Sequence, residues 1–124
     1  MNSSVLKSSA IMLTLDFLWI WLVAGKMFAK MTENIQQNKM TVKPTGALVA
    51  YAAMILLFNT FIHKETKDTD AFLLGALVYA VYDGTNYALF EKWDAKTAFI
   101  DILWGGCLFY ITKKLTFDIT LSAS

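Results

Sequence analysis

The chain alternates between four long apolar stretches and short, charged connections. The stretches cover about residues 9–28, 44–63, 71–90 and 95–112, and charged residues lie at their boundaries. Each stretch is close to the roughly 20 apolar residues that a helix needs to cross the hydrocarbon core of a bilayer. The pattern therefore predicts four membrane-spanning helices, with both ends of the chain on the same side of the membrane.

Residues at these boundaries indicate where the helices begin. Pro44 is the only proline, and it suits a first helical position because the N–H that it lacks has no partner there. Asp70 and Asp94 precede the third and fourth stretches, where an N-cap acceptor is favoured. The connections are too short for a further domain. We therefore expect an all-α, four-helix transmembrane bundle with short loops, forming a single domain over residues 1–124.

The composition agrees with a membrane location. Hydrophobic residues make up 56% of the chain and charged residues 17%, compared with roughly 45–50% and 25% in an ordinary soluble domain. Eleven lysines and no arginine stand against ten acidic residues, which gives a net charge of +1. The chain lacks the basic surface and the guanidinium groups that are typical of nucleic-acid binding. We expect a multi-pass integral membrane protein that has the lipid bilayer, and no nucleic acid, as its partner.

Three carboxylates interrupt the apolar stretches: Asp16, Asp83 and Asp101. An acidic residue at the centre of a spanning helix costs about 2.5–3.5 kcal/mol on insertion scales, so each should face the protein interior and have a polar partner. Counting 1.5 Å per residue places Asp83 and Asp101 at one depth and Asp16 roughly 8 Å closer to the chain ends. We therefore predict that Asp83 pairs with Asp101.

Aromatic and amide side chains share helical faces with these acids. On the third stretch, a spacing of three and four residues groups Tyr79 and Asn86 with Asp83. On the first and fourth stretches a tryptophan follows the acid by three residues, and its indole N–H can donate to the acid of its own or a neighbouring helix. The predicted buried polar cluster consists of Asp16, Trp19, Tyr79, Asp83, Asn86, Asp101 and Trp104.

Small residues at helical spacing predict where helices approach closely. Gly75 and Gly105 lie on the acid-bearing faces of the third and fourth stretches. The second stretch has a stripe of small residues without an acid, which predicts a packing surface: Gly46, Ala47, Ala50 and Ala53. Trp93 and Tyr51 are predicted to be anchors at the membrane interface.

Three short motifs follow one another along the chain: Leu15-Asp16-x-x-Trp19, Tyr82-Asp83-x-Thr85-Asn86 and Asp101-Ile102-x-Trp104-Gly105. This series resembles a family of small four-helix membrane proteins, known mainly as a domain of unknown function, with members in bacteria and in large DNA viruses. The resemblance covers almost the whole chain. It implies the fold and the membrane location, and it supplies no established activity.

The buried acids leave two functions open. We expect a non-enzymatic protein in which they act as hydrogen-bonding glue, within a structural or assembly subunit of a larger complex such as a virion, where a viral inner membrane would hold it. The alternative is a proton- or ion-coupled transporter or channel for a small substrate, acting as an oligomer because one four-helix chain is small for transport. Two acids at one depth cannot readily both be charged, so this alternative predicts a shared proton.

Other chemistry has little support in the sequence. His63 is the only histidine and lies at a helix end next to Lys64, and Cys107 is the only cysteine and lies on an apolar helix. No nucleophile accompanies a base, and no arginine is present to bind a phosphate. We therefore expect no catalytic residue, no metal site and no cofactor.

Overall fold

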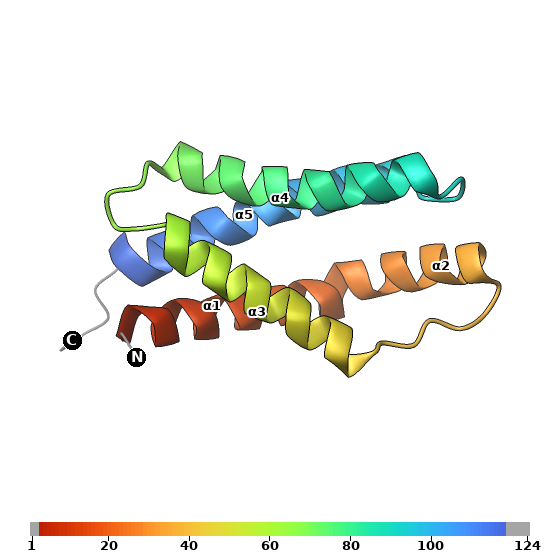
Figure 1. The fold of residues 1–124 in the computed structure, drawn as a ribbon, viewed down its shortest axis with the longest axis horizontal. Helices are drawn as coiled ribbons and strands as arrows, with labels where there is room; N and C mark the ends of the chain where they lie inside the picture. The colour runs from red at the N-terminus through yellow and green to blue at the C-terminus, as the bar shows by residue number, and fades with distance from the viewer. Residues whose placement is uncertain (1–2, 119–124) are drawn as a thin grey trace.

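The computed structural model describes residues 3–118, and these residues form helices joined by short connections. The first helix is continuous over 34 residues and consists of α1 (Ser3–Trp19), the π-helical segment η1 (Ile20–Ala24) and α2 (Gly25–Gln36). The remaining elements are α3 (Pro44–Phe61), α4 (Asp68–Leu89), α5 (Ala95–Lys113) and the π-helical segment η2 (Lys114–Asp118) that extends α5. Figure 1 shows these helices as long rods, with the start of α1 and the end of η2 at the same end of the molecule. The predicted all-α fold with four helices is confirmed.

Two of the described helices are long and apolar enough to cross a membrane. They are the first helix, Ser3–Gln36, and α3, Pro44–Phe61. Helices α4 and α5 have 22 and 19 residues, which is sufficient length, but they are less apolar because they hold more polar side chains. Their passage through the membrane stays a prediction.

The first helix is much longer than the predicted residues 9–28. Charged residues end an apolar stretch, but they do not end a helix when they are good helix formers on its outer face. In α2 the exposed Lys26 and Lys30 lie on the outer face, while Met31 is buried. The helix ends at Gln37, which has a left-handed backbone with a φ of 60°. Helices α3 and α4 begin and end within three residues of their predicted bounds, and α5 does so too, but η2 continues this helix to Asp118.

Two of the three predicted helix starts, those at Pro44 and Asp94, are confirmed. Pro44 is the first residue of α3, and Asp94 is the N-cap of α5, where its carboxylate accepts a hydrogen bond of 3.2 Å from the backbone N–H of Thr97. The prediction of an N-cap at Asp70 is wrong, because α4 begins two residues earlier and Asp70 lies within its first turn. A carboxylate is also favourable there, near the positive end of the helix dipole.

Helices α4 and α5 approach each other through glycines. A Cβ atom on Gly75 would collide with the backbone oxygen of Gly105 and would lie 2.8 Å from the Cβ of Phe109. A Cβ atom on Gly105 would collide with the ring of Tyr79 and would lie 2.8 Å from the backbone oxygen of Gly75. The predicted close packing of these two faces is confirmed, because only residues without a side chain allow the backbones to meet.

A buried apolar core joins the helices near the end where the chain begins. It consists of Met12, Phe58, Ile62, Ala71, Leu108 and Phe109. The rings of Phe58 from α3 and Phe109 from α5 meet edge to face, with their centroids 5.7 Å apart. This core fixes one end of α3 against the other helices.

The predicted packing surface of small residues on α3 is wrong for the single chain. Gly46 has open space where its side chain would be, and Ala50 and Ala53 are exposed. The neighbouring side of α3 faces inward instead, because Met54 and Phe58 bury far more apolar surface there than alanines could.

Candidate functional site

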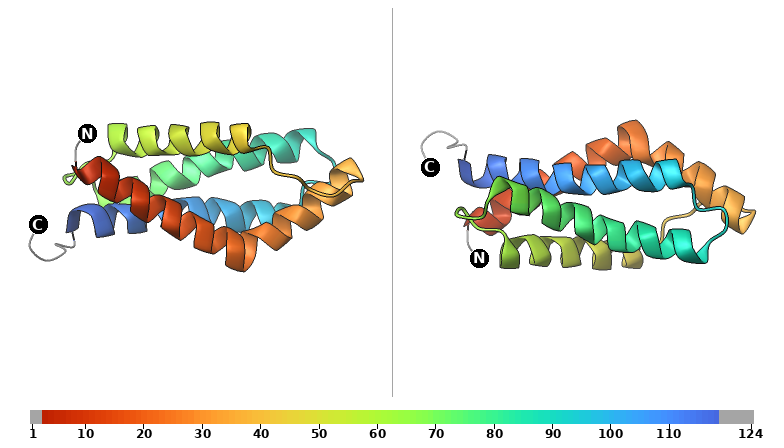
Figure 2. Two further views of the ribbon diagram at one scale, coloured as in Figure 1. Left: turned by 90° about the horizontal axis from the view of Figure 1, so that it is seen from below. Right: turned by 90° about the horizontal axis from the view of Figure 1, so that it is seen from above.

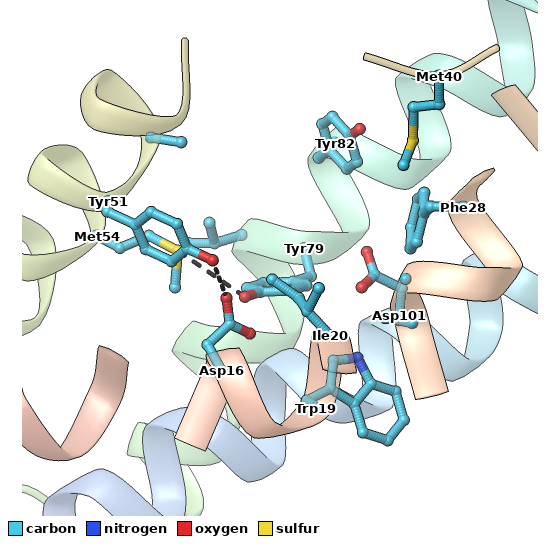
Figure 3. Close-up of a pocket in the computed structure, with 14 residues that line it drawn as sticks. Asp16, Trp19, Ile20, Phe28, Met40, Tyr51, Met54, Tyr79, Tyr82 and Asp101 are labelled. Atoms are coloured by element: carbon cyan, nitrogen blue, oxygen red, sulfur yellow. Dashed lines mark hydrogen bonds between the residues drawn. The ribbon is translucent and has the colours of Figure 1, made fainter. Parts of the chain in front are cut away.

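A cavity of about 430 Å³ lies between the first helix, α3, α4 and α5 (Figure 3). The first helix contributes Asp16, Trp19, Ile20, Ala24, Gly25 and Phe28; the connection after it Met40; α3 Ala50, Tyr51 and Met54; α4 Val78, Tyr79 and Tyr82; and α5 Asp101. This lining is largely apolar and aromatic. It includes two carboxyl groups and neither a lysine nor a histidine, so its formal charge is negative when the acids are ionised.

Asp16 accepts hydrogen bonds from two other helices. The hydroxyl group of Tyr51 on α3 donates to Oδ2 at 2.6 Å, and the indole Nε1 of Trp104 on α5 donates to Oδ1 at 2.8 Å. Both distances lie in the range of charge-assisted hydrogen bonds. The prediction that an indole N–H serves the acid of a neighbouring helix is confirmed at Trp104. Asp16 thereby connects three helices at one point.

Trp19 does not donate a hydrogen bond to an acid, although its spacing from Asp16 suggests this. Its ring stacks on that of Trp104, with the centroids 4.7 Å apart and the planes 7° from parallel. Its own indole Nε1 is buried and has no hydrogen-bond partner among the described residues. Trp19 therefore positions Trp104 through stacking and leaves an unused donor in the wall of the cavity.

Asp83 and Asp101 form the predicted pair. Asp83 is completely buried and Asp101 is 8% exposed. Their carboxyl groups lie close to each other, and the indole of Trp93 lies near Asp83. Within residues 3–118, neither carboxylate forms an ion pair, and no hydrogen bond of good geometry reaches an oxygen of Asp83. The pair thus lacks a counter-cation, and Asp101 connects it to the cavity.

Tyr79 joins this site, whereas Asn86 does not. The hydroxyl group of Tyr79 donates to the sulfur of Met54 at 3.8 Å, which links α4 to α3 across the cavity (Figure 3). Asn86 is half-buried, and its side chain lies beside Tyr82. Asn86 therefore does not line the cavity, although its spacing places it one turn of α4 from Asp83.

Tyr51 and Tyr82 line the cavity and are absent from the predicted cluster. Tyr51 is predicted to be a membrane-interface anchor, and this prediction is wrong because Tyr51 is half-buried and bonded to Asp16. The spacing of Tyr51 with Met54 and Phe58, at three and seven residues, is the signal that would have placed it on an inward face. Tyr82 directly precedes Asp83 and so lies on a neighbouring face of α4, one that the cavity also reaches.

The prediction that Trp93 anchors the chain at the interface is also wrong. Trp93 is only 8% exposed and packs against three aromatic rings, with centroids 5.9–6.0 Å apart: Phe28, Tyr82 and Phe90. Short connections at this end fold the ring inward, where it buries more apolar area than at the surface. Trp93 thereby helps to bury Asp83 at this end of the molecule.

The π-helical segment η1 borders the cavity. Ile20 and Ala24 line it together with Gly25, the residue that follows. A Cβ atom on Gly25 would lie 2.6 Å from the backbone oxygen of Ile20, so this wide turn requires a glycine. Single π-helical turns inside α-helices are frequent at functional sites, which agrees with the position of η1.

A cluster of four charged residues ties η2 to the start of α4. Lys113 is nearly buried and donates to Oδ1 of Asp68 at 2.8 Å, and Lys114 donates to Oδ2 at 3.1 Å. Asp118 lies 3.1 Å from Lys114. The hydrogen bonds from the two lysines lower the pKa of Asp68, and those to Asp118 and Asp68 raise the pKa of Lys114. This cluster lies at the end of the molecule where the chain begins.

Metal ligands do not gather in the part of the chain that the structure describes. No group of three or more histidine, cysteine or acidic side chains there is arranged to hold a metal ion. His63 is exposed, and Cys107 is half-buried with a free thiol.

Comparison with known proteins identifies a family. Residues 2–117 match the profile of a family described as "Predicted membrane protein (DUF2177)". No curated protein and no solved structure shows significant similarity to the chain. Because the match covers nearly the whole sequence, the chain belongs to this family of membrane proteins, in agreement with the resemblance of its motifs.

Proposed function

We propose that the chain is a non-enzymatic, four-pass membrane protein that binds a small organic cation in the cavity and exchanges it for protons. The observation that carries this proposal is the cavity itself: about 430 Å³ of space bordered by carboxyl groups and aromatic rings. Small-molecule sites in proteins have volumes of roughly 300–1,000 Å³ and combine an apolar lining with a few polar groups.

The charges of the site favour a cation. Asp83 and Asp101 lie side by side without a cationic partner among the described residues, and burying a charge without a partner is costly. An ammonium group next to Asp101 would neutralise one of these charges. The rings of Tyr51, Tyr79 and Tyr82 add faces that attract cations.

Exchange follows from the same electrostatics. The acidic pair can be neutralised by a proton or by a bound cation, and each reduces the affinity for the other. Asp16 holds two hydrogen bonds and keeps the helices in place, so we assign the exchanging site to Asp101 and Asp83. The protein would thus couple the binding of the cation to the release of a proton.

Four crossings are supported by where the polar residues of α5 lie. Thr97 and Asp101 of this helix are buried inside the protein, whereas Phe99 and Leu103 are exposed. A helix of moderate overall hydropathy can face lipid when its polar residues are turned inward. This arrangement supports membrane passage of α5, and with it of its partner α4.

Binding can be tested with benzyltrimethylammonium and its neutral carbon isostere, neopentylbenzene. The fluorescence of the stacked pair Trp19 and Trp104 should report binding to detergent-solubilised protein, because the cavity touches Trp19. We expect the cation to bind at least about tenfold more tightly than the isostere, since burial strengthens cation–π and ionic attraction. Equal binding of the two compounds would contradict the proposal.

Variants assign the effect to the cavity. Asp101→Asn should weaken binding of the cation about tenfold or more while leaving binding of the neutral isostere unchanged. Asp70→Asn removes the same charge from the exposed first turn of α4 and should have no effect. In proteoliposomes with a trapped pH dye, an imposed gradient of the cation should drive proton movement with the wild type and not with Asp101→Asn.

An assembly subunit is the second candidate, and one observation favours it. Gly46, Ala50 and Ala53 are exposed small residues along one side of α3, beside the cavity that Ala50 borders, and such stripes mediate contacts between membrane helices. A Cys107→Ser background with Ala53→Cys should give disulfide-linked dimers in membranes, whereas the exposed Val81→Cys on α4 should not. The larger complex expected from the sequence, such as a virion, stays a prediction.

A further inference from the structure

A second pocket, of about 580 Å³, lies at the end of the molecule away from the chain ends. Its lining comes from three segments: Met27, Lys30, Met31 and Asn34 of α2, Lys92 and Asp94 of the connection between α4 and α5, and Lys96, Thr97 and Ile100 at the start of α5. Figure 2 shows the end of α2 and this connection at the same end of the molecule. The pocket is separate from the cavity that holds Asp16 and Asp101.

Three lysines from three segments surround this pocket. Within residues 3–118, none of Lys30, Lys92 and Lys96 forms an ion pair, and Lys92 makes one long hydrogen bond of 3.4 Å to the backbone oxygen of Asn34. Lysine side chains brought together in this way repel one another. A bound anion would relieve that repulsion.

The acids near the pocket do not neutralise the lysines. Asp94 is the one acid in the lining, and it is engaged by the backbone N–H of Thr97 at 3.2 Å and by its hydroxyl group at 2.6 Å. Glu33 and Glu91 are exposed and form no ion pair with these lysines. Three positive charges against one negative charge leave an excess of two.

The deeper part of the pocket is apolar. Met27 and Ile100 are half-buried in its wall, and Met31 is buried beneath Trp93. On the outside of α5, Phe99 and Leu103 are exposed and continue this apolar surface along the helix. The pocket therefore combines cationic groups with hydrocarbon, as a site for an amphiphilic anion requires.

We infer that this pocket binds the phosphate group of an anionic phospholipid, with Lys30, Lys92 and Lys96 around the phosphate and Met27 and Ile100 against the first carbons of the acyl chains. Basic pockets between membrane helices are known to hold anionic headgroups, and each lysine near an anionic surface contributes about 1 kcal/mol, which is roughly fivefold in affinity. The inference rests on the membrane location of the family and is independent of the cation site.

The thermal midpoint of the detergent-solubilised protein provides the test. Phosphatidylglycerol should raise the midpoint, whereas phosphatidylcholine and millimolar inorganic phosphate should not. In the triple variant Lys30→Gln/Lys92→Gln/Lys96→Gln the concentration of phosphatidylglycerol that gives half the shift should rise roughly a hundredfold, from three lysines at about fivefold each. These side chains lie at the surface or in the pocket wall, so the variant should retain its helical circular dichroism.

A matched control removes three charges from the same end of the molecule but outside the pocket. The triple variant Lys26→Gln/Lys39→Gln/Lys43→Gln should keep the response to phosphatidylglycerol nearly unchanged. Equal loss in both triple variants would show general charge attraction and would overturn the site. Equal stabilisation by phosphatidylcholine would overturn the requirement for an anion, and equal stabilisation by inorganic phosphate would overturn the assignment to a lipid.

Discussion

Helices α4 and α5 are held to each other in a different way from the way α3 is held to the other helices around the cavity. Helices α4 and α5 meet backbone to backbone at Gly75 and Gly105, with no space for a methyl group. Helix α3 contacts the other helices through Phe58 and through a few polar contacts, and its outer side is exposed. The contact between α4 and α5 is thus tight, whereas α3 is held to the other helices by separate side-chain contacts.

The difference teaches where the cavity can open. Interhelical polar contacts in membranes are worth about 0.6 kcal/mol on average, and of the three that hold α3 only the bond from Tyr51 to Asp16 involves an acid, so the other two contribute little. The three contacts run from Ser8 to Asn59 at 3.0 Å, from Tyr51 to Asp16 and from Tyr79 to Met54. We expect α3 to move outward while the hairpin of α4 and α5 stays intact.

The largest expected effect comes from filling the glycine contact. Gly75→Ala should destabilise the protein by about 1–3 kcal/mol, the usual cost of overpacking, because its methyl group would strike the backbone of α5. Thermal unfolding in detergent measures this. The control Gly84→Ala, on the same helix and facing open space, should be neutral or slightly stabilising. Similar losses in both variants would disprove the contrast between a packed and an open face.

A smaller effect is expected from cutting the bond between α3 and the first helix. Tyr51→Phe leaves Oδ2 of Asp16 without its donor and should cost about 1–2 kcal/mol, the lower part of the range for a buried group left unpaired, because Trp104 still donates to Oδ1. Hydrogen exchange should increase in α3 and remain unchanged in α4 and α5. Tyr87→Phe, at an exposed tyrosine of α4, is the matched control. Faster exchange across all helices would show that α3 is not an independent unit.

The N-cap of α5 should have an effect of about 1 kcal/mol. Asp94→Ala removes the acceptor of two hydrogen bonds from Thr97, and losing an N-cap costs about 0.5–2 kcal/mol. The loss should be seen in the unfolding midpoint and in local exchange at the first turn of α5. Asp70→Ala, within the first turn of α4, should change the midpoint less. The reverse order would contradict the assignment of the cap.

The smallest effect is expected from acid at the cluster around Asp68. Because the pKa of Asp68 is lowered in the folded protein, its stabilising contribution is complete above its ordinary pKa of 3.8 and is lost as the pH falls through the folded value. After correction for the intrinsic exchange rate at each pH, the protection of the amides in Lys114–Asp118 should therefore decrease between pH 5 and pH 3. In Asp68→Asn this segment should exchange faster at pH 5 and show a weaker dependence on pH. If the pH dependence of exchange in Asp68→Asn equalled that of the wild type, the charged cluster would not be what holds η2 in place.

Much of the fold could be predicted because a membrane imposes a simple pattern. Apolar length set the helices, and the cost of a buried acid predicted that Asp83 would meet Asp101. The apolar pattern does not predict the extension of the first helix into α2. Hydropathy indicates where the chain can face lipid, and it does not indicate where a polar helix continues. Asp70 was misplaced for a related reason, because a carboxylate is favourable both at the N-cap and within the first turn.

The side chains that complete the site were harder to predict. Tyr51 and Trp93 are amphipathic, so their types suit a membrane interface and a protein interior equally well. What decides between the two is the packing of neighbouring helices, which one sequence does not reveal. Asn86 has the right spacing on α4, but its side chain interacts with Tyr82 and does not line the cavity.

The length of the first helix links this protein to the thickness of its membrane. At 1.5 Å per residue its 34 residues extend about 51 Å, but its apolar stretch, about residues 9–28, extends roughly 30 Å, which matches the hydrocarbon core. A thinner bilayer favours a greater tilt and a thicker one a steeper helix. The wide turn Ile20–Ala24 lies near the middle of this rod and beside the cavity, so a change in tilt would be transmitted to the place where the rod is irregular. Lipids of different chain length would then change the shape of the cavity without contacting the residues that line it.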